Sequence, residues 1–191
     1  MTEENVIGNF YDKYETRNPV AGKLMSDFIG SVKSLFLEAR PDTFLEVGCG
    51  EGLLTQQLLD ISVGPLNRVE ACDLSLGRIA EGLDSSIVFK EASIFELPYE
   101  QNEFDLVVCC EVLEHIEDPA SGLAELCRVA RRAVLISTPW EPVWCILNLL
   151  RGKYISRLSN TPGHIQHFGR RDLINLAKTH LDDLRVKTPL P

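Results

Sequence analysis

The sequence lacks several features that would assign it to a specialised class of protein. None of its 6 cysteines belongs to a Cys-x-x-Cys pair, and it contains no internal repeat or low-complexity tract. The longest apolar run, residues 143–150, is interrupted by Asn148 and is far too short to cross a bilayer. The acidic, polar start of the chain resembles no export signal. We therefore expect a cytoplasmic protein without a membrane span, whose cysteines are buried free thiols.

Basic residues are also in deficit. The chain of 191 residues has 19 Lys and Arg against 28 Asp and Glu, which gives a net charge of -9. Because such a surface repels polyanions, nucleic acid is not expected as a partner. The length and the 45% content of hydrophobic residues are those of one soluble globular domain with a sizeable core.

Short apolar stretches alternate with amphipathic, helix-like stretches along most of the chain. Strands are expected at 43–47, 68–72, 86–90, 104–110 and 133–137, with a sixth near 184–187. Helices are expected between Pro19 and Pro41 and at 53–61, 76–83, 119–129, 143–150 and 172–180. Strands that alternate with helices form a parallel sheet covered on both faces. The sequence therefore predicts a single α/β domain with a doubly wound, mostly parallel sheet.

The most informative segment is a glycine-rich turn after the first expected strand. Residues 44–52 read Phe-Leu-Glu-Val-Gly-Cys-Gly-Glu-Gly, so an acidic residue and a Gly-x-Gly-x-Gly turn precede a helix. Glycines allow a sharp turn and a close approach of the backbone to a ligand, and the helix presents free N–H groups to it. Asp73 follows about twenty residues later, where an acidic side chain can accept both hydroxyls of a ribose. The order predicts an adenosine-containing cofactor rather than a purely structural turn.

Two classes of cofactor fit this pattern. The dinucleotide fingerprint Gly-x-Gly-x-x-Gly would need its third glycine at Leu53, and the chain has no Tyr-x-x-x-Lys pair. Glu46, two residues before Gly48, is unfavourable beside a pyrophosphate but suits a cofactor with a sulfonium and an ammonium group. A nicotinamide oxidoreductase is thereby disfavoured, although it stays as an alternative.

Taken together, these motifs resemble those of a known family. Residues 45–52 resemble the first motif of class I S-adenosylmethionine-dependent methyltransferases, and the resemblance covers most of the chain. It extends to the loop 92–99, which flanks the adenine in that family, and to 104–115, the fourth strand and the loop beside the methionine moiety. A small Rossmann-like group of unassigned substrate is similar as well. The resemblance implies S-adenosyl-L-methionine as the cofactor, with contacts from Tyr11, Glu46, Gly48, Cys49, Gly50, Gly52, Asp73, Leu74, Ser93, Ile94 and Glu111.

The resemblance also divides the predicted single domain, 1–191, into three parts. These are an N-terminal helical cover (1–42), the cofactor-binding core (43–138), and an acceptor-side segment with the last strand (139–191). Two features depart from the family's pattern. Ser93 stands where members often carry Asp, so the adenine amino group would be contacted by the hydroxyl or by main chain. The sequence has no counterpart of the family's last, antiparallel strand, either because the sequence stops short of it or because the strand is absent; in the second case the exposed sheet edge would need cover, for which another subunit is a candidate.

Methyl transfer needs alignment of the reactants and, for an acceptor that carries a proton, a base. His115 lies in the turn that the resemblance places beside the methyl group, and His167 lies on the acceptor side, so these are the candidate catalytic residues. The chain has no Asn-Pro-Pro-Tyr-type motif after the fourth strand, which disfavours nucleobase and glutamine acceptors. We expect a small-molecule acceptor with an oxygen or nitrogen nucleophile.

Other interpretations stay open at this point. Glu111, Glu114 and His115 would share one face of a helical turn, and His164 or His167 would complete a set of metal ligands. This set resembles that of small-RNA terminal 2′-O-methyltransferases, but Glu-x-x-Glu-His also occurs in class I enzymes without a metal, and we assign none.

The aromatic and apolar segments at either end of the chain also allow more than one role. Tyr11 or Tyr14 could close over the methionine end of the cofactor, or could pack the first helix onto the sheet. The apolar segment 140–154 fits a lid over the acceptor, ordinary core packing or contact with a membrane surface. It could also hold a partner if the chain were a non-catalytic relative of the family.

Overall fold

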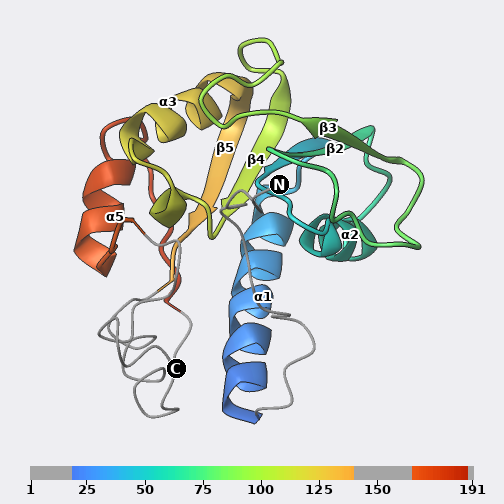
Figure 1. The fold of residues 1–191 in the computed structure, drawn as a ribbon, viewed down its shortest axis with the longest axis horizontal. Coiled ribbons are helices and arrows are strands. Elements are labelled where there is room, and N and C mark those ends of the chain that lie inside the picture. The colour runs from blue at the N-terminus through green and yellow to red at the C-terminus, as the bar shows by residue number, and fades with distance from the viewer. Residues whose placement is uncertain (1–18, 140–164, 189–191) are drawn as a thin grey trace, which may run out of the picture.

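The computed structural model describes residues 19–139 and 165–188, and its centre is a parallel sheet (Figure 1). The strands are β1 (Thr43–Val47), β2 (Arg68–Asp73), β3 (Ile87–Glu91), β4 (Phe104–Cys110) and β5 (Ala130–Ser137). They pair in the order β3-β2-β1-β4-β5, and every pair is parallel. Strands β1 to β3 therefore follow one another toward one edge of the sheet. The chain then crosses back to place β4 on the other side of β1, and β5 forms the second edge. This arrangement confirms the expected doubly wound sheet.

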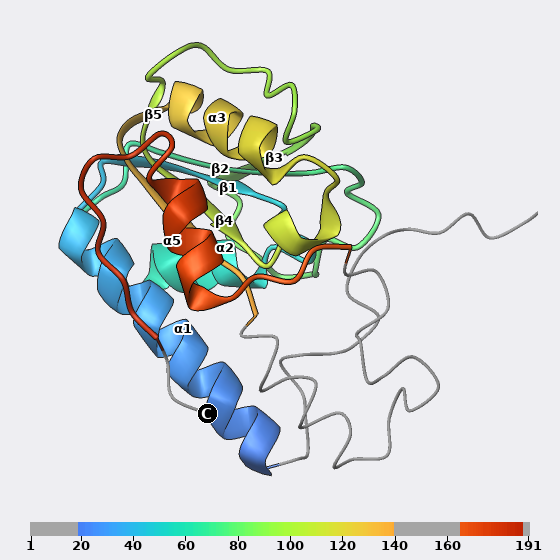
Figure 2. The same cartoon turned by 90° about the vertical axis from the view of Figure 1, so that its left-hand side faces the viewer.

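Helices cover both faces of the sheet (Figure 2). The helices are α1 (Pro19–Ala39), α2 (Leu53–Asp60), α3 (Pro119–Val129) and α5 (Arg170–Ala177), and a short 3-10 turn, η1 (Leu113–His115), precedes α3. On one face, α1 and α2 pack against the sheet through Phe36 and Leu58 among others. On the other face, α3 and α5 contribute Leu126 and Leu176 to a second cluster.

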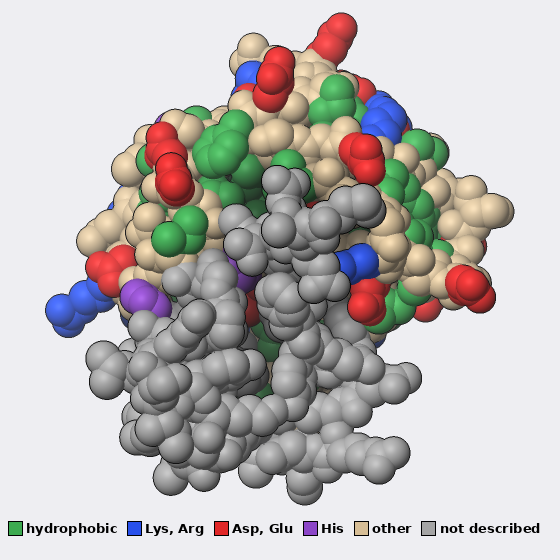
Figure 3. Space-filling model, viewed as in Figure 1, with side chains coloured by type: hydrophobic (Ala, Val, Ile, Leu, Met, Phe, Trp, Pro, Cys, Tyr) green, Lys and Arg blue, Asp and Glu red, His purple; other side chains and the backbone are tan. Residues whose placement is uncertain are grey.

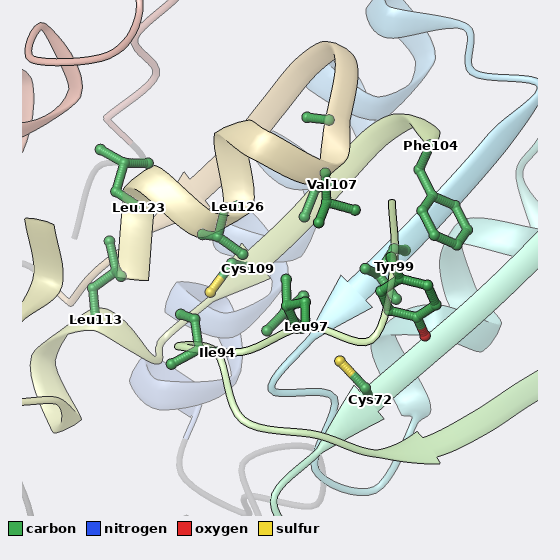
Figure 4. Packing of buried hydrophobic residues seen from close by; sticks show 14 of the residues in the cluster. Cys72, Ile94, Leu97, Tyr99, Phe104, Val107, Cys109, Leu113, Leu123 and Leu126 are labelled. Atoms are coloured by element: carbon green, nitrogen blue, oxygen red, sulfur yellow. The ribbon is translucent and has the colours of Figure 1, made fainter. Parts of the chain in front are cut away.

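The strand β1 shows why the sheet is buried on both sides. Its Leu45 and Val47 point into the cluster beneath α3, whereas Phe44 points into the cluster beneath α1 and α2. Figure 4 shows the first cluster, in which Leu126 of α3 lies over the sheet. Full burial of one such leucine stabilises the fold by about 1.5–3 kcal/mol. Both clusters therefore fix β1, whose carboxyl end leads directly into the glycine turn.

Several expectations about the elements are confirmed. The strands β1 and β4 and the helix α3 begin and end at the expected residues. Asp118 caps α3 by accepting a hydrogen bond from the Ser121 N–H at 3.1 Å, and Pro119 occupies the first position, where its missing N–H costs nothing. The cysteines of the described residues are free thiols; Cys49, Cys72, Cys109 and Cys110 are buried and Cys127 is partly buried.

Two expected elements are wrong. Residues 76–83 form turns rather than a helix. The Ala80 N–H donates to the carbonyl of Glu51, a distant residue, at 3.0 Å instead of to a carbonyl within a helix. Residues 184–187 form no strand. Instead, Arg185 and Lys187 each lie 3.0 Å from the Glu38 carboxylate of α1, so this segment runs along α1. The sheet of the described residues accordingly has five strands. The expected helix at 143–150 lies outside the described residues.

The surface agrees with the charge of the sequence. Acidic side chains are spread over the described part of the face in Figure 3. Among the residues that the structure describes, none of the helices combines the length and apolar character that crossing a membrane requires.

Candidate functional site

The candidate site lies where the strand order reverses, between β1 and β4. Parallel α/β sheets bind ligands outside the carboxyl ends of their strands at such a point. Here the carboxyl ends of β1, β2 and β4 lead into the glycine turn 48–52, Asp73 and Glu111, respectively. Three motifs that are far apart in the sequence are thus brought to one edge of the sheet.

The glycine turn is tied to β2 by its backbone. The N–H groups of Gly48 and Cys49 both donate to the Cys72 carbonyl, at 2.8 and 3.1 Å. Because these two N–H groups are used inside the protein, the turn has a fixed position above β2. The Cys49 thiol is buried in the cluster beneath α1 and α2, so only the main chain of Cys49 can contact a cofactor.

The three glycines of the turn are needed for different structural reasons. A Cβ at Gly48, whose φ is +78°, would overlap the Val112 side chain, and a Cβ at Gly52 would lie 2.9 Å from Leu83 Cδ1. These two glycines are required by packing. A Cβ at Gly50 would meet nothing within 4 Å, although its φ of +55° also favours glycine. Among the described residues, this side of Gly50 therefore faces open space, where a ligand can approach the backbone.

Asp73 is attached to that open part of the turn. Its Oδ2 accepts a hydrogen bond from the Gly50 N–H at 2.8 Å, and no other hydrogen bond reaches this carboxylate within the described residues. Leu74, the next residue, has 73% of its surface exposed and extends the same edge. The second carboxylate oxygen of Asp73 remains available to hydroxyl groups of a ligand.

Glu46 lies beneath the turn, near the end of β1. Only 3% of its surface is exposed, and the Thr55 hydroxyl of α2 donates a hydrogen bond to its Oε2. Burial, together with the nearby Asp73 carboxylate, raises the pKa of Glu46 to about 8, although the Thr55 hydrogen bond opposes the rise. A group of this kind ionises readily when a cation comes close, because the cation replaces the lost hydration.

The loop after β3 contributes Ser93 and Ile94 in different ways. The Ser93 hydroxyl accepts a hydrogen bond from the Phe95 N–H at 3.2 Å, so it shapes its own loop. The Ile94 side chain is only 7% exposed and packs into the cluster beneath α3. Its side chain therefore belongs to the core, and only the main chain of Ile94 can face a cofactor.

The exit of β4 differs from the helical turn that the sequence allowed. Glu111 has a φ of +60° and is fixed by the end of β5: its N–H donates to the Ser137 carbonyl at 3.1 Å, and its Oε1 accepts from the Ser137 hydroxyl at 3.0 Å. The 3-10 turn η1 starts only at Leu113, so Glu111 shares no helical face with Glu114 and His115.

His115 and His167 are brought to the same side of the molecule by backbone hydrogen bonds. The N–H groups of Ile165 and Gln166 both donate to the Glu114 carbonyl, at 2.9 and 3.0 Å. Phe168 is buried in the cluster beneath α3, which anchors the segment further. His115 is partly buried, with its Nε2 3.9 Å from Glu114 Oε1, whereas His167 is exposed.

Part of the expected site cannot be placed. Tyr11, Tyr14, His164 and the segment 140–154 lie outside the described residues. In the described part of the chain, no group of three or more His, Cys, Asp or Glu side chains could hold a metal ion. Thr55 and Ser137, which bond to Glu46 and Glu111, were not predicted from the sequence. For Thr55 a signal existed, namely a polar residue on the apolar face that Leu54 and Leu58 form on α2.

Comparison with known proteins gives a consistent result. Residues 45–136 match the family described as a methyltransferase domain. The ubiquinone biosynthesis O-methyltransferase of Xanthomonas oryzae pv. oryzae is 33% identical over 144 residues, which are 70% of this chain and 57% of that protein. The ajmaline N-methyltransferase of Rauvolfia serpentina is 32% identical over 104 residues, 52% of this chain and 36% of that protein.

A solved structure supports the same fold. The magnesium protoporphyrin IX methyltransferase of Synechocystis PCC 6803, with bound SAH, superposes with a TM-score of 0.61 and 18% identity, covering 86% of this chain and 78% of that one. The chain spans less than two thirds of the length of both curated relatives. Residues 45–136 of this chain therefore match a methyltransferase domain, and the fold is the one seen in a solved methyltransferase.

Proposed function

We propose that this chain is an S-adenosylmethionine-dependent methyltransferase that methylates an oxygen or a nitrogen of a small-molecule acceptor. The observation that carries the proposal is the hydrogen bond from the Gly50 N–H to Asp73 Oδ2, at 2.8 Å, at the carboxyl edge of the sheet. It holds a carboxylate beside the one glycine of the turn that faces open space. The names of the two relatives, an O- and an N-methyltransferase, support either acceptor atom.

Each residue of the site is proposed to contact a different part of the cofactor. Asp73 would accept the two ribose hydroxyls, and the backbone of 48–52 would line the sulfonium end of the cofactor. Glu46 would favour the cationic amino-acid end through its negative charge. The main chain of 93–94 and the side chain of Leu74 would flank the adenine, with Glu111 near the methionine moiety. Tyr11 stays a proposed cover.

The chemistry needs little from the protein beyond alignment and one base. When bound, the cofactor supplies a methyl group activated by its sulfonium. His115 and His167 are proposed to remove the proton of the acceptor, because the hydrogen bonds to the Glu114 carbonyl bring their two segments together. The three-part division at residues 42 and 138 remains the proposed organisation of the domain.

The setting of the enzyme is also a proposal. Buried free thiols are typical of a reducing compartment, which supports a cytoplasmic location. The net charge of -9 favours a small molecule over nucleic acid as the acceptor. The edge strands β3 and β5 offer a place where a second subunit could cover the sheet.

Titration calorimetry tests the proposal directly. The chain should bind S-adenosylmethionine and S-adenosylhomocysteine with micromolar affinity and should not bind NAD. Asp73→Ala should weaken the binding of both ligands at least tenfold, because hydrogen bonds to a charged group contribute roughly 1.5–3 kcal/mol. The exposed Asp60→Ala is the matched control and should leave the affinities unchanged. Binding of NAD alone, or no binding of any of the three ligands, would refute the proposed function.

A further inference from the structure

A buried side-chain contact joins α2 to β1 next to the glycine turn. Thr55 is fully buried, and it lies on the third residue of α2, immediately after the glycine turn. Its hydroxyl donates to the Oε2 of Glu46, nine residues earlier in the chain. The strand, the turn and the helix therefore close into a small loop whose two ends are joined by this hydrogen bond.

The direction of the Thr55 hydroxyl is informative. A threonine inside a helix commonly donates back to the carbonyl four residues earlier, which here is Glu51. That carbonyl instead accepts the Ala80 N–H at 3.0 Å, and the Thr55 hydroxyl reaches across to the strand. The hydroxyl thus fixes a carboxylate that burial alone would leave costly to orient and to ionise.

The surroundings of this carboxylate favour a positively charged ligand. Glu46 lies near the carboxyl end of β1, beside the strand β2 that ends in Asp73, so a cation bound here would meet the Asp73 carboxylate and would favour the ionisation of Glu46. The open side of the turn, at Gly50, lies between them in the chain. A ligand that places an ammonium group near the turn would gain from both acids.

We propose that Thr55 is a positioning residue for the cofactor, whose hydroxyl orients the Glu46 carboxylate toward the ammonium group of S-adenosylmethionine. The inference rests on the proposed function. It assigns to Thr55 a selective role: the hydroxyl matters for ligands that carry the amino group and not for adenosine recognition, which belongs to Asp73 and the 93–94 loop.

The test compares two ligands across three variants of the full chain. Thr55→Val removes the hydroxyl and keeps the shape, whereas Thr55→Ser keeps the hydroxyl. The ligands are S-adenosylhomocysteine and its analogue that lacks only the amino group. Thr55→Val should weaken binding of S-adenosylhomocysteine about tenfold, or about 1.4 kcal/mol, and binding of the analogue less than twofold. Thr55→Ser should bind both ligands as the natural chain does.

Thr43→Val is the matched control, because it removes a hydroxyl that bonds at the other end of β1, where Thr43 Oγ1 accepts the Asp105 N–H at 3.0 Å. It should leave both affinities unchanged. An equal loss of both ligands in Thr55→Val, or an equal loss in Thr55→Ser, would overturn the role of the hydroxyl. A natural chain that does not bind S-adenosylhomocysteine would refute the proposed function itself, so the two failures are distinguishable.

Discussion

The buried carboxyl group of Glu46 should make the stability of this protein fall as the pH rises. Burial raises its pKa from the ordinary 4.5 to about 8 in the folded chain. The folded state therefore holds a proton that the unfolded chain releases above pH 4.5. It follows that the stabilising effect of this proton is fully present below pH 4.5 and is lost as the pH rises through 8.

The magnitude follows from the difference between the two pKa values. Each pH unit of difference corresponds to about 1.4 kcal/mol, and most of the interval lies between pH 5 and pH 8. The free energy of unfolding should therefore decrease by roughly 3 kcal/mol across this range because of Glu46 alone. In Glu46→Gln, which keeps the shape and cannot ionise, this decrease should be absent.

Urea unfolding of both proteins at pH 5, 6, 7 and 8 measures the effect. The quantity to plot is the difference in unfolding free energy between the natural chain and Glu46→Gln, because the other titrating groups cancel in it. The thiols of Cys49, Cys72 and Cys110 near Glu46 do not titrate between pH 5 and pH 8, because burial raises their pKa values far above the ordinary 9.0. The difference should fall by roughly 3 kcal/mol from pH 5 to pH 8.

Glu70→Gln is the matched control for this experiment. Glu70 is as buried as Glu46, but its carboxylate is bonded by Arg68, Lys90 and Tyr99. Burial favours a higher pKa for Glu70, but these partners outweigh it and lower the pKa. The difference in unfolding free energy between the natural chain and Glu70→Gln should therefore be flat between pH 5 and pH 8. A flat curve for Glu46→Gln as well would show that Glu46 ionises in the folded protein as it does in water, and the reasoning would be wrong.

Three further experiments test other parts of the structure. Gly48→Ala should destabilise the fold by about 1–3 kcal/mol in urea unfolding, because its methyl group overlaps Val112; Gly50→Ala should cost less stability and instead weaken S-adenosylhomocysteine binding in calorimetry. His115→Gln should lower the transfer of radiolabelled methyl to phenols or amines about 100-fold while the cofactor affinity stays unchanged; equal activity would remove His115 from catalysis. Hydrogen bonds from Arg131 keep the pKa of Asp105 low against the opposing effect of burial, so Asp105→Asn should destabilise the chain above pH 4 and progressively less below it.

The sequence was informative wherever neighbouring residues decide the structure. The short apolar stretch of β1, followed by glycines and a helix, placed the turn and Asp73 at one edge of the sheet because each piece lies within a few residues of the next. The loop 76–83 was predicted wrongly for the opposite reason. The Ala80 N–H bonds to the Glu51 carbonyl, and the N–H of Asp84, just after the loop, bonds to the Gln56 side chain. Such long-range partners compete with helix formation without leaving a local pattern.

Side-chain partners across the fold were equally hard to foresee. Glu46 was predicted from its position in the motif, but its hydrogen bond with Thr55 depends on how α2 packs on β1. Ile94 was expected at the cofactor, and its side chain turned out to belong to the core, because α3 has a glycine at position 122 whose missing side chain leaves it room. Burial on the far side of a loop cannot be predicted from the loop alone.

The Glu114 carbonyl, which accepts the N–H groups of both Ile165 and Gln166, has a practical consequence for engineering. Together with the buried Pro139 at the end of β5, it supplies two fixed attachment points for residues 140–164. Under the proposed division of the domain, exchanging residues 140–164 for the matching stretch of a relative with another acceptor should change acceptor preference and leave cofactor affinity unchanged. The joint at Glu114 is the feature that each such graft should preserve.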